Sequence, residues 1–562
     1  MNLHRIFLPW VAAACIAVSA CGTDDITITD INPIDNELDT GDDNLDSVVF
    51  DRTVTVVYSG GIATVEGTGD SIDCTVSGAG VTLVNAGSEV VRYELSGSTT
   101  DGFFKLYSGK KQAVVLNGLS LTSGTGAAIN IQGRYNGAGN KPSGGKRTWV
   151  VVQGSNSLTD GVGYSATPEC EDEKGALFCE GKLVVCGSGS LAVTARGKNG
   201  IASDDYVHFQ NGPTVKVNSA AGHGVRGKDA ILVSGGTIEV EVSANMKKGF
   251  SSDSLVHFAG GVTSVKVTGS AAYDSEDEEY TGTAGVKADV AFVMSGGSLT
   301  VENSGTGGKG ISCDGTGTFS GGTVDVTVTG SNYSAGDISA KGIKCDGDIS
   351  FSGGTVNVSC RSHEGIESKG EITVSGGEVY SYSQADDAIN SGSHFTVSGG
   401  MVCGHATSND GLDANGNFYI KGGVVYAIGS SQPEVAIDAN TEKNYKLYVQ
   451  EGATLIAIGG LERGSSLEQS CYQASSWSKN TWYALSTGGN TYAFKTPSSG
   501  GTALVVSGPS TPTLTSGVSV TGGTSHFAGT LTVGGTVSGG NAVSLSAYSG
   551  GSGPGGGGGG PH

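Results

Sequence analysis

The sequence is short of cations. Lys and Arg together number 32 against 54 Asp and Glu, which gives a formal net charge of −22. Binding to nucleic acid, or docking on an anionic lipid surface, needs clustered cations. We therefore expect no nucleic-acid partner, and any membrane association has to come from a lipid anchor.

The sequence also lacks the short motifs of several enzyme classes. It contains no phosphate-binding loop, no catalytic-triad motif and no redox motif. No Cys-x-x-Cys pair or His/Cys cluster indicates zinc. Candidate chemistry must therefore be sought in how the chain repeats.

The N-terminus has the features of a targeting signal. Basic residues precede an apolar run, residues 6–17, that is too short to span a membrane as a mature helix. The Val-Ser-Ala-Cys that follows at 18–21 resembles the lipobox of bacterial lipoproteins, which implies cleavage before Cys21 and lipidation of its thiol. The alternatives are an ordinary secretory signal cleaved near Ala20 or an uncut anchor.

A strongly acidic segment follows. Residues 21–47 include nine acidic residues and no Lys or Arg, so they cannot bury enough apolar surface to fold and should form an extended tether. An acidic run directly after a lipidated Cys resembles the surface-export signal of lipoproteins of the Bacteroidetes group. That resemblance implies a bacterial cell-surface protein, lipid-anchored to the outer membrane.

The rest of the chain is organised by a repeat. Four consecutive blocks of 23 residues run from Lys341 to Gln432, and their S-G-G or K-G-G turns begin 23 residues apart. A fixed period of this size marks a solenoid, and apolar residues alternating with period 2 within each block indicate short strands. We predict an all-β fold, a parallel β-helix with three short strands per ~23-residue rung. Less regular copies of the block extend upstream.

These patterns suggest five segments. They are a lipoprotein signal peptide at 1–20, an acidic tether at 21–50, the β-helix at 51–460, a small C-terminal β region at 461–549 and a Gly-rich tail at 550–562. The chain holds 96 glycines, and outside this tail they fall at turn spacing. We expect a monomer.

The cysteines leave two possibilities open. Of the 11, Cys15 and Cys21 belong to the signal. Cys313 and Cys345 share one corner position in successive rungs, whose ~4.8 Å spacing suits a disulfide. Cys179 and Cys186 flank a short turn and could also pair. The alternative is a set of buried free thiols that fill a corner.

Charged residues fall in two columns along one corner of the predicted coil. The position before each Gly-Ile corner is basic in rungs such as those of Lys309 and Lys341, and acidic in the later rungs. The late rungs bring together eight oxygen-bearing side chains: Glu364, Glu367, Asp386, Asp387, Asn390, Asp410, Asp413 and Asp438.

Stacked carboxylates repel one another unless a cation neutralises them. Calcium takes oxygen ligands at ~2.3–2.6 Å, so two oxygens across one ion lie about as far apart as two rungs. We predict Ca²⁺ between rungs, bridging Asp387 to Asp410 or Asp413 to Asp438. The alternative is a solvated acidic edge paired with lysines from the loops.

Aromatic side chains line the strand that precedes this corner. Tyr380, Tyr382, His405 and Tyr426 occupy its outward positions, where rings could stack on the apolar faces of sugars. The alternative is that the C-terminal segment covers them. Two insertions, residues 271–284 and 331–340, interrupt the same corner, so they should lie on one side of the coil. The first is acidic, which suits either a second calcium loop or a solvated charge run.

The Gly-Ile corners, the S-G-G turns and the D-A-I-N and D-G-L-D-A-N blocks together resemble a known family. They are similar to the bacterial carbohydrate-binding β-helix proteins of the pectate-lyase-like superfamily, over roughly residues 54–460. The resemblance implies a right-handed parallel β-helix, bound calcium, and affinity for plant polysaccharide, either cellulose or acidic galacturonans, without strong hydrolytic activity.

Two other functions stay open beside polysaccharide binding. A polysaccharide lyase acting on uronate polymers by β-elimination needs a Lys or Arg base tuned near the working pH, and Lys341, Lys344 and Lys369 are the candidates. An adhesin or scaffold that displays a rigid solenoid fits the anchor and the tether equally well. We favour the non-enzymatic binder.

Overall fold

The chain is all-β. The computed structural model describes residues 40–165 and 167–550, and within these ranges it contains strands and short 3-10 turns but no α-helix. No helix in the described part of the chain is long and apolar enough to cross a membrane. The predicted signal peptide, Cys21, most of the tether and the tail from 551 onward lie outside the described residues.

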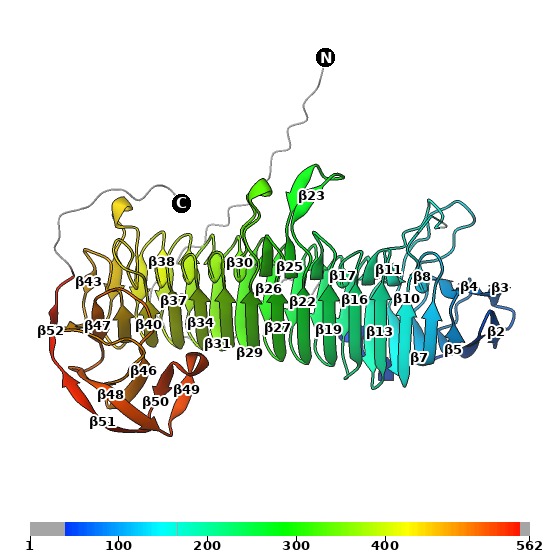
Figure 1. Ribbon diagram of the computed structural model, residues 1–562. Coiled ribbons are helices and arrows are strands. Elements are labelled where there is room, and N and C mark those ends of the chain that lie inside the picture. Colours follow the sequence, from blue (N-terminus) through cyan, green and yellow to red (C-terminus); the bar gives the residue numbers. More distant parts are fainter. Residues whose placement is uncertain (1–39, 166, 551–562) are drawn as a thin grey trace, which may run out of the picture. The chain divides into compact units, whose positions relative to one another are not determined.

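The chain divides into two compact units, residues 1–42 and 43–562. In the first unit the described residues form η1, Thr40–Asp42. Every strand of the described residues belongs to the second unit, in large sheets dominated by parallel pairing. Successive strands stack in chain order, which Figure 1 shows as the progression from blue to yellow.

Most strands of this unit belong to three ladders. In each ladder, the equivalent strands of successive rungs pair side by side. The first ladder is a 14-stranded sheet. Its strands are β3 (Ile72–Ser77), β4 (Ala79–Asn85), β6 (Gly102–Ser108), β8 (Ile129–Gln132), β11 (Gly175–Cys179), β14 (Asn199–Ser203), β17 (Val225–Gly227), β20 (Lys248–Ser252), β25 (Thr283–Ala288), β28 (Gly308–Cys313), β30 (Ile343–Cys345), β32 (Ile366–Ser368), β35 (Ile389–Ser391) and β38 (Leu412–Ala414).

The second and third ladders belong to one 30-stranded sheet, because some strands run through both. The strands that span both are β1 (Arg52–Ser59), β5 (Val91–Thr99), β7 (Gln112–Thr122), β29 (Thr316–Val328) and β31 (Ile349–Cys360). The second ladder adds β9 (Thr148–Gln153), β12 (Leu183–Gly187), β15 (Tyr206–Phe209), β18 (Ala230–Val233), β21 (Leu255–Phe258), β26 (Ala291–Met294), β33 (Ile372–Val374), β36 (Phe395–Val397), β39 (Phe418–Ile420), β41 (Leu447–Val449) and β43 (Ser466–Leu467). The third adds β10 (Ser155–Thr159), β13 (Ser190–Ala195), β16 (Thr214–Ser219), β19 (Thr237–Val242), β22 (Val262–Val267), β27 (Ser298–Asn303), β34 (Glu378–Ser383), β37 (Met401–Ala406), β40 (Val424–Ile428) and β42 (Thr454–Ile458).

Register in the late rungs follows the sequence period. Ile343 pairs with Ile366, Ile366 with Ile389, and Ile389 with Leu412, each 23 residues further along. These side chains point inward and are at most 1% exposed. Phenylalanines form a second internal column, in which the rings of Phe319 and Phe351 stack at 4.8 Å. The alternation that predicted strands therefore also marks the core.

Glycine is needed at two kinds of corner. Gly377, in an S-G-G turn, has a φ of +74°, a left-handed conformation that side-chain-bearing residues avoid. Gly342, in a Gly-Ile corner, packs against the next rung so closely that a Cβ would lie 2.3 Å from the carbonyl oxygen of Gly365. Rungs can stack at this corner only where no side chain intervenes.

The two ends of the stack depart from parallel pairing. At the start, β2 (Ile62–Glu66) pairs antiparallel with β1, and β3 pairs antiparallel with β4. At the other end, β47 (Leu504–Ser507) pairs antiparallel with β42, and β44 (Cys471–Ala474) with β47 and β52 (Leu545–Tyr548). The predicted run of parallel rungs over 51–460 therefore begins with antiparallel hairpins.

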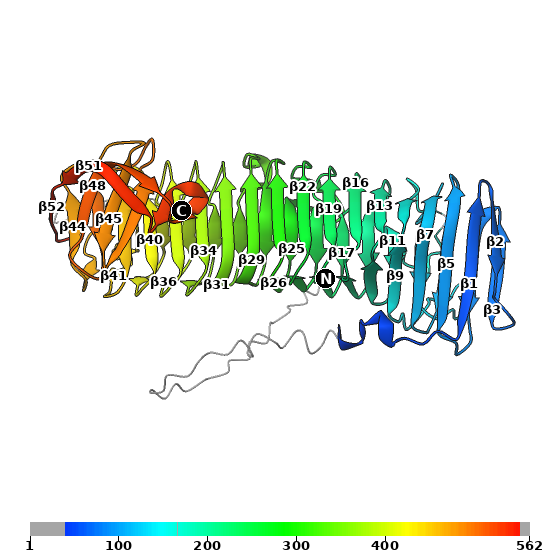
Figure 2. The same ribbon diagram turned by 90° about the horizontal axis from the view of Figure 1, so that it is seen from below.

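Beyond the stack, a six-stranded antiparallel sheet covers the third ladder. Its strands are β45 (Trp482–Thr487), β46 (Asn490–Lys495), β48 (Thr513–Thr521), β49 (Thr524–His526), β50 (Leu531–Val533) and β51 (Thr536–Val543), with η5 (Phe527–Gly529) between two of them. Glu378 on β34 anchors it, accepting hydrogen bonds from the Phe527 amide at 2.6 Å and pairing with His526 at 2.8 Å. Figure 2 shows this sheet in orange and red beside β40.

The two insertions lie together, as predicted. The first forms a hairpin of β23 (Ala272–Asp274) and β24 (Glu279–Thr281), and the second contains η3 (Ser334–Gly336). The rings of Tyr280 and Tyr333 join the two insertions at 5.9 Å. The acidic tip of the hairpin is exposed. This agrees with the alternative that these charges are solvated.

The acidic tether ends earlier than predicted. Asp43 is only 2% exposed, and its carboxylate pairs with Arg147 at 2.6 Å. The next residues form η2 (Leu45–Ser47), capped by the Asn44 side chain. Composition alone suggested an extended chain to residue 50, but buried polar partners on the ladders hold the segment from Asp43 in place.

The nine described cysteines are all free thiols. Cys313 and Cys345 do occupy paired positions on β28 and β30, and both are fully buried. Cys179 and Cys186 are buried as well. Of the two possibilities that the sequence left open, the structure agrees with buried free thiols and not with disulfides.

Candidate metal and glycan site

Two charged columns run side by side at the first-ladder corner. In one column Lys341, Glu364, Asp387 and Asp410 precede successive corners. In the other, inside strands β30, β32, β35 and β38, the paired residues are Lys344, Glu367, Asn390 and Asp413. The predicted change from basic to acidic is therefore present in three dimensions.

The second column continues beyond the last regular repeat. Leu412 bridges to Ile437, and Ile437 to Leu461. Asp438 and Glu462 consequently follow Asp413 in the column. Sequence reasoning missed Glu462, although Gly460-Leu461-Glu462 repeats the pattern of Gly411-Leu412-Asp413.

The acidic corner has two halves. In the first half, which consists of Glu364, Glu367 and Asp386, cationic side chains of the protein neutralise the carboxylates. The Lys341 ammonium pairs with Glu364 at 3.1 Å and with Glu367 at 2.6 Å. His363, another residue that sequence reasoning missed, contacts Glu364 and lies 2.9 Å from Asp386.

The pKa values in this half follow from these contacts. Burial opposes protonation of His363, but its hydrogen bonds to Asp386 and Glu364 outweigh burial and raise its pKa to about 9. Burial alone would raise the pKa values of Glu364 and Asp386, yet the His363 partner lowers both. Glu364, Glu367 and Asp386 thus already have protein counter-charges.

The second half of the acidic corner, which consists of Asp387, Asp410, Asp413 and Asp438, has no cationic side chains of the described chain paired with it. Among the ion pairs of the described residues, none involves Asp387, Asp410, Asp413 or Asp438. One oxygen each from Asp410, Asp413 and Asp438 all lie within 4.8 Å of one another. Asp387 and Asp410 are 6% and 9% exposed.

Burial and mutual repulsion raise the pKa values of these carboxyl groups strongly. Burial, with the neighbouring carboxylates, raises the pKa of Asp387 and of Asp410 well above the ordinary range. Burial also raises the pKa of Asp413 to about 6. For Asp438, burial and then the hydrogen bond with Glu462 raise the pKa to about 11. At neutral pH this half therefore has to hold either protons or a cation.

The donor set of the second half suits a hard divalent cation. All its groups are oxygen donors, which calcium prefers, and no cysteine or histidine is among them. The 4.8 Å limit on their separation is compatible with two oxygens on opposite sides of one Ca²⁺. Asp410, Asp413, Asp438 and Glu462 are the residues that could hold the ion.

The predicted lyase bases are engaged in ion pairs. Lys344 pairs with Asp346 at 2.6 Å and Lys369 with the same carboxylate at 3.1 Å. Despite its burial, the pKa of Lys341 is raised by Glu364 and Glu367. By contrast, burial and then neighbouring lysines lower the pKa of Lys309 to about 8, so Lys309, which the sequence did not single out as a base, is the better tuned amine.

The predicted aromatic surface on the third ladder is largely covered. Tyr426 is fully buried, its hydroxyl donates to the Lys495 carbonyl at 2.8 Å, and its ring lies against Phe494. Tyr380 packs on Phe527. For these two tyrosines the covering alternative is correct, because the six-stranded sheet sits over them.

The remaining two aromatic candidates are half-buried. Tyr382 and His405 contact each other, with ring centroids 4.9 Å apart. Burial lowers the pKa of His405 to about 4, which keeps its ring neutral at physiological pH.

A different aromatic pair lies on the second ladder. Tyr419 on β39 and Tyr448 on β41 are partners in the register, with rings stacked at 5.1 Å. His394 approaches Tyr419 edge-on, and the Lys421 ammonium lies 4.9 Å from the Tyr419 ring. Both tyrosines are half-buried and occupy the same rungs as Asp413 and Asp438.

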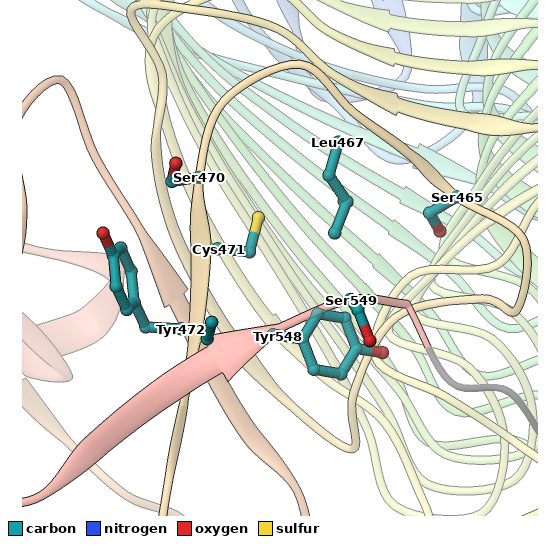
Figure 3. A pocket seen from close by; sticks show the side chains of 8 residues that line it. Ser465, Leu467, Ser470, Cys471, Tyr472, Tyr548 and Ser549 are labelled. Atoms are coloured by element: carbon teal, nitrogen blue, oxygen red, sulfur yellow. The ribbon is translucent and has the colours of Figure 1, made fainter.

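A cavity of about 380 Å³ at the end of the stack is lined by residues in and next to β43, β44 and β52. Figure 3 shows Leu467, Cys471 and Tyr548 around it, with Tyr472 turned away from the Tyr548 ring. Its lining residues are Ser465, Leu467, Ser470, Cys471, Tyr472, Ala547, Tyr548 and Ser549. Because this lining contains no carboxylate, the cavity does not extend the acidic corner.

Comparison with known proteins gives one family match. Residues 77–254 and 303–388 match the model of a family described as carbohydrate-binding domain-containing protein. The match includes Glu364 and Asp387 and ends before Asp410. No curated protein matches the sequence.

Among solved structures, a polysaccharide lyase-like protein from C. thermocellum, determined as a gadolinium derivative, is similar at 18% identity with a TM-score of 0.38. The match covers 47% of this chain and 96% of that one.

Proposed function

We propose that this chain is a calcium-dependent polysaccharide-binding protein of the bacterial cell surface, built on a right-handed parallel β-helix. The three stacked ladders and the 23-residue register support the coil. The family match over residues 77–254 and 303–388 supports a carbohydrate ligand.

The observation that carries the calcium requirement is the uncompensated group Asp410, Asp413 and Asp438. Its oxygens converge within 4.8 Å, and no cation of the described chain pairs with them. A bound Ca²⁺ would take the place of the protons that Asp410 and Asp438 otherwise retain and would neutralise Asp413, and Glu462 could supply a further oxygen.

An acidic polymer is the ligand that best fits this arrangement. A polyuronate is repelled by a protein of net charge −22 unless a cation lies between the two sets of carboxylates. Calcium held at the corner would supply that cation, and Tyr419 and Tyr448 on the second ladder of the same rungs offer aromatic surface to the apolar faces of the sugars. The proposed ligand is polygalacturonate, and cellulose is the neutral comparison.

Lipidation of Cys21 supplies the anchor in this proposal. The residues that precede Asp43 then link the anchor to the first strands. The cation deficit that argues against direct docking on anionic lipid is consistent with attachment by a lipid chain.

A second candidate function, β-elimination of a uronate polymer, is favoured by Lys309. Its pKa of about 8 places a neutral amine within reach at mildly alkaline pH. Lys309 precedes the corner one rung before Lys341, next to the acidic columns. A lyase would use the cation to pair with the uronate carboxylate.

Titration calorimetry of the full chain with polygalacturonate and with soluble cello-oligosaccharide, in excess calcium, tests the proposal. The absorbance of the unsaturated elimination product is followed in the same samples. Heat of binding with polygalacturonate and unchanged absorbance is expected for the binder. Rising absorbance would make the chain a lyase and Lys309→Ala the next variant, and no heat with either glycan would contradict polysaccharide binding.

A further inference from the structure

Three side chains from distant parts of the chain form a hydrogen-bonded line on the second ladder. The Asp43 carboxylate Oδ2 lies 2.6 Å from Nδ1 of His208 on β15. The other ring nitrogen of His208, Nε2, lies 2.8 Å from Oγ of Ser234, at the turn after β18. The order is carboxylate, Nδ1, Nε2, hydroxyl.

Asp43 is held rigidly at the start of this line. Its Oδ1 accepts hydrogen bonds from Arg147 Nε, at 2.6 Å, and from the Tyr206 hydroxyl. Its backbone carbonyl accepts from Trp149 Nε1 at 2.8 Å and from Gln210 Nε2 at 2.7 Å. The carboxylate is therefore buried, oriented and ionically paired before any ligand arrives.

His208 is oriented by this contact. Hydrogen bonding of Nδ1–H to the Asp43 carboxylate fixes the tautomer that leaves a lone pair on Nε2. That lone pair faces the Ser234 hydroxyl. Of the three residues, Asp43 and His208 are buried and Ser234 is exposed, so only the hydroxyl end of the line meets solvent.

Ser234 differs from Ser375 and Ser398, two serines at the same turn position in later rungs, and shares a histidine contact with Ser295. The Ser375 and Ser398 hydroxyls approach the backbone carbonyls of Phe351 and Val374 at 3.4 and 3.5 Å. Ser234 retains such a 3.4 Å contact, with the Phe209 carbonyl, but its short hydrogen bond is with His208. A turn does not require that bond.

We propose that Asp43, His208 and Ser234 form a nucleophilic site that hydrolyses acyl esters, with Ser234 as the nucleophile. The roles follow from the geometry, since the same arrangement activates serine on unrelated folds. Because Ser234 lies on an exposed turn, the site suits an ester carried by an extended molecule, such as an O-acyl group on a polysaccharide. This activity is independent of the calcium site.

The reaction balances without a cofactor. Ser234 Oγ attacks the ester carbonyl carbon and its proton passes to His208 Nε2. The carbon–oxygen bond to the alcohol breaks, and the alcohol leaves with that proton. Water then attacks the acyl-serine, giving one proton to His208. The carboxylic acid departs, and the proton returns to Ser234.

Backbone amides next to the nucleophile are available for the oxyanion. Gly235 and Gly236 follow Ser234, and in the described chain neither amide donates to a backbone carbonyl. Amides of this kind stabilise the negative oxygen of a tetrahedral intermediate. Gly236 has a φ of +92°, which turns the backbone sharply directly after the serine.

The test is covalent labelling of the purified full-length chain with a fluorophosphonate, read by intact mass and peptide mapping. One adduct on Ser234 is expected, together with hydrolysis of p-nitrophenyl acetate. Ser234→Ala removes both signals, and Asp43→Asn lowers the labelling rate by roughly 10⁴-fold because His208 takes the wrong tautomer.

Ser295→Ala is the matched control. The Ser295 hydroxyl also lies 2.8 Å from a histidine Nε2, that of His257, and this variant should label normally. Thermal unfolding of each variant confirms that it is folded. Absence of a Ser234 adduct on the folded wild-type chain, equal labelling of Ser295, or ester hydrolysis that survives Ser234→Ala would overturn the proposal.

Discussion

Replacing Asp413 by Asn should have opposite effects on the protein with and without calcium. Asp413 belongs to the uncompensated carboxylates, and its pKa is about 6 in place of the ordinary 3.8. The folded state therefore binds the proton more tightly than the unfolded state. The contribution of Asp413 to stability is therefore greatest below pH 4 and declines as the pH rises through about 6, because deprotonation leaves a buried charge.

The structure gives the size of this effect. The pKa of Asp413 differs by roughly two pKa units between the folded and unfolded states. At 1.36 kcal/mol per unit, this amounts to about 3 kcal/mol at pH 7. Asparagine has no proton to lose, and Asn390 already occupies the same column one rung earlier. In EDTA at pH 7 the variant should be more stable than the wild type by up to about 3 kcal/mol.

In excess calcium the wild type should instead be more stable than Asp413→Asn. A ligand at 1,000 times its dissociation constant stabilises a folded protein by about 4.1 kcal/mol, which exceeds the advantage of about 3 kcal/mol that the variant has in EDTA, and loss of a carboxylate ligand removes most of that gain from the variant. The assay is urea unfolding at pH 7 in EDTA and in excess calcium, read from midpoints at constant slope. Glu451→Gln, in an exposed turn, is the control and should behave as wild type. A variant that is less stable than wild type in EDTA, or that responds equally to calcium, would refute the reasoning.

Three further predictions concern other parts of the molecule. The raised pKa of His363, about 9 against an ordinary 6.5, stabilises the fold below pH 6.5 and the contribution is lost as the pH rises through 9. His363→Gln should flatten the pH dependence of unfolding in that window, and an unchanged profile would contradict the ion-pair account. Phe319→Ala should cost about 3–5 kcal/mol in unfolding free energy, because it leaves a hole in the stacked internal column; a cost under about 1 kcal/mol would mean that the rungs collapse around it. Tyr448→Ala should weaken glycan binding several-fold in calorimetry, since one aromatic contact contributes about 1 kcal/mol, whereas Tyr382→Ala should have little effect; the reverse order would place the glycan on the third ladder.

The late rungs could be predicted from the sequence because their period is regular. Equal spacing of Ile343, Ile366 and Ile389 fixes which residues stack, and this placed the acidic columns correctly. The Gly-Gly turns and Gly-Ile corners were recognisable because only glycine tolerates the close approach and the positive φ found there.

Contacts between distant segments could not be predicted in this way. The outward direction of Tyr426 follows from strand alternation, but its burial depends on a sheet that begins more than 50 residues later. Asp43 lay in a segment whose composition indicated an extended chain, and its partners Arg147 and His208 are known only from the fold. For the same reason the sequence showed no triad motif, since Asp43, His208 and Ser234 come from separate parts of the chain.

The repeat pattern also could not predict which carboxylates are paired with a cationic side chain. Lys341 and His363 neutralise one half of the acidic corner through side-chain geometry that column counting does not resolve. Glu462 follows an irregular rung, so the period no longer located it. The proposed metal site is accordingly smaller than the eight residues predicted from the sequence, and centres on Asp410, Asp413 and Asp438.

The most direct test of the central proposal is the binding isotherm of polygalacturonate with the wild-type chain and with Asp413→Asn, each measured in calcium and in EDTA. The calcium account predicts saturable binding by the wild type only in calcium, and binding by the variant weakened at least tenfold. Equal affinity of the wild-type chain in calcium and in EDTA would contradict it.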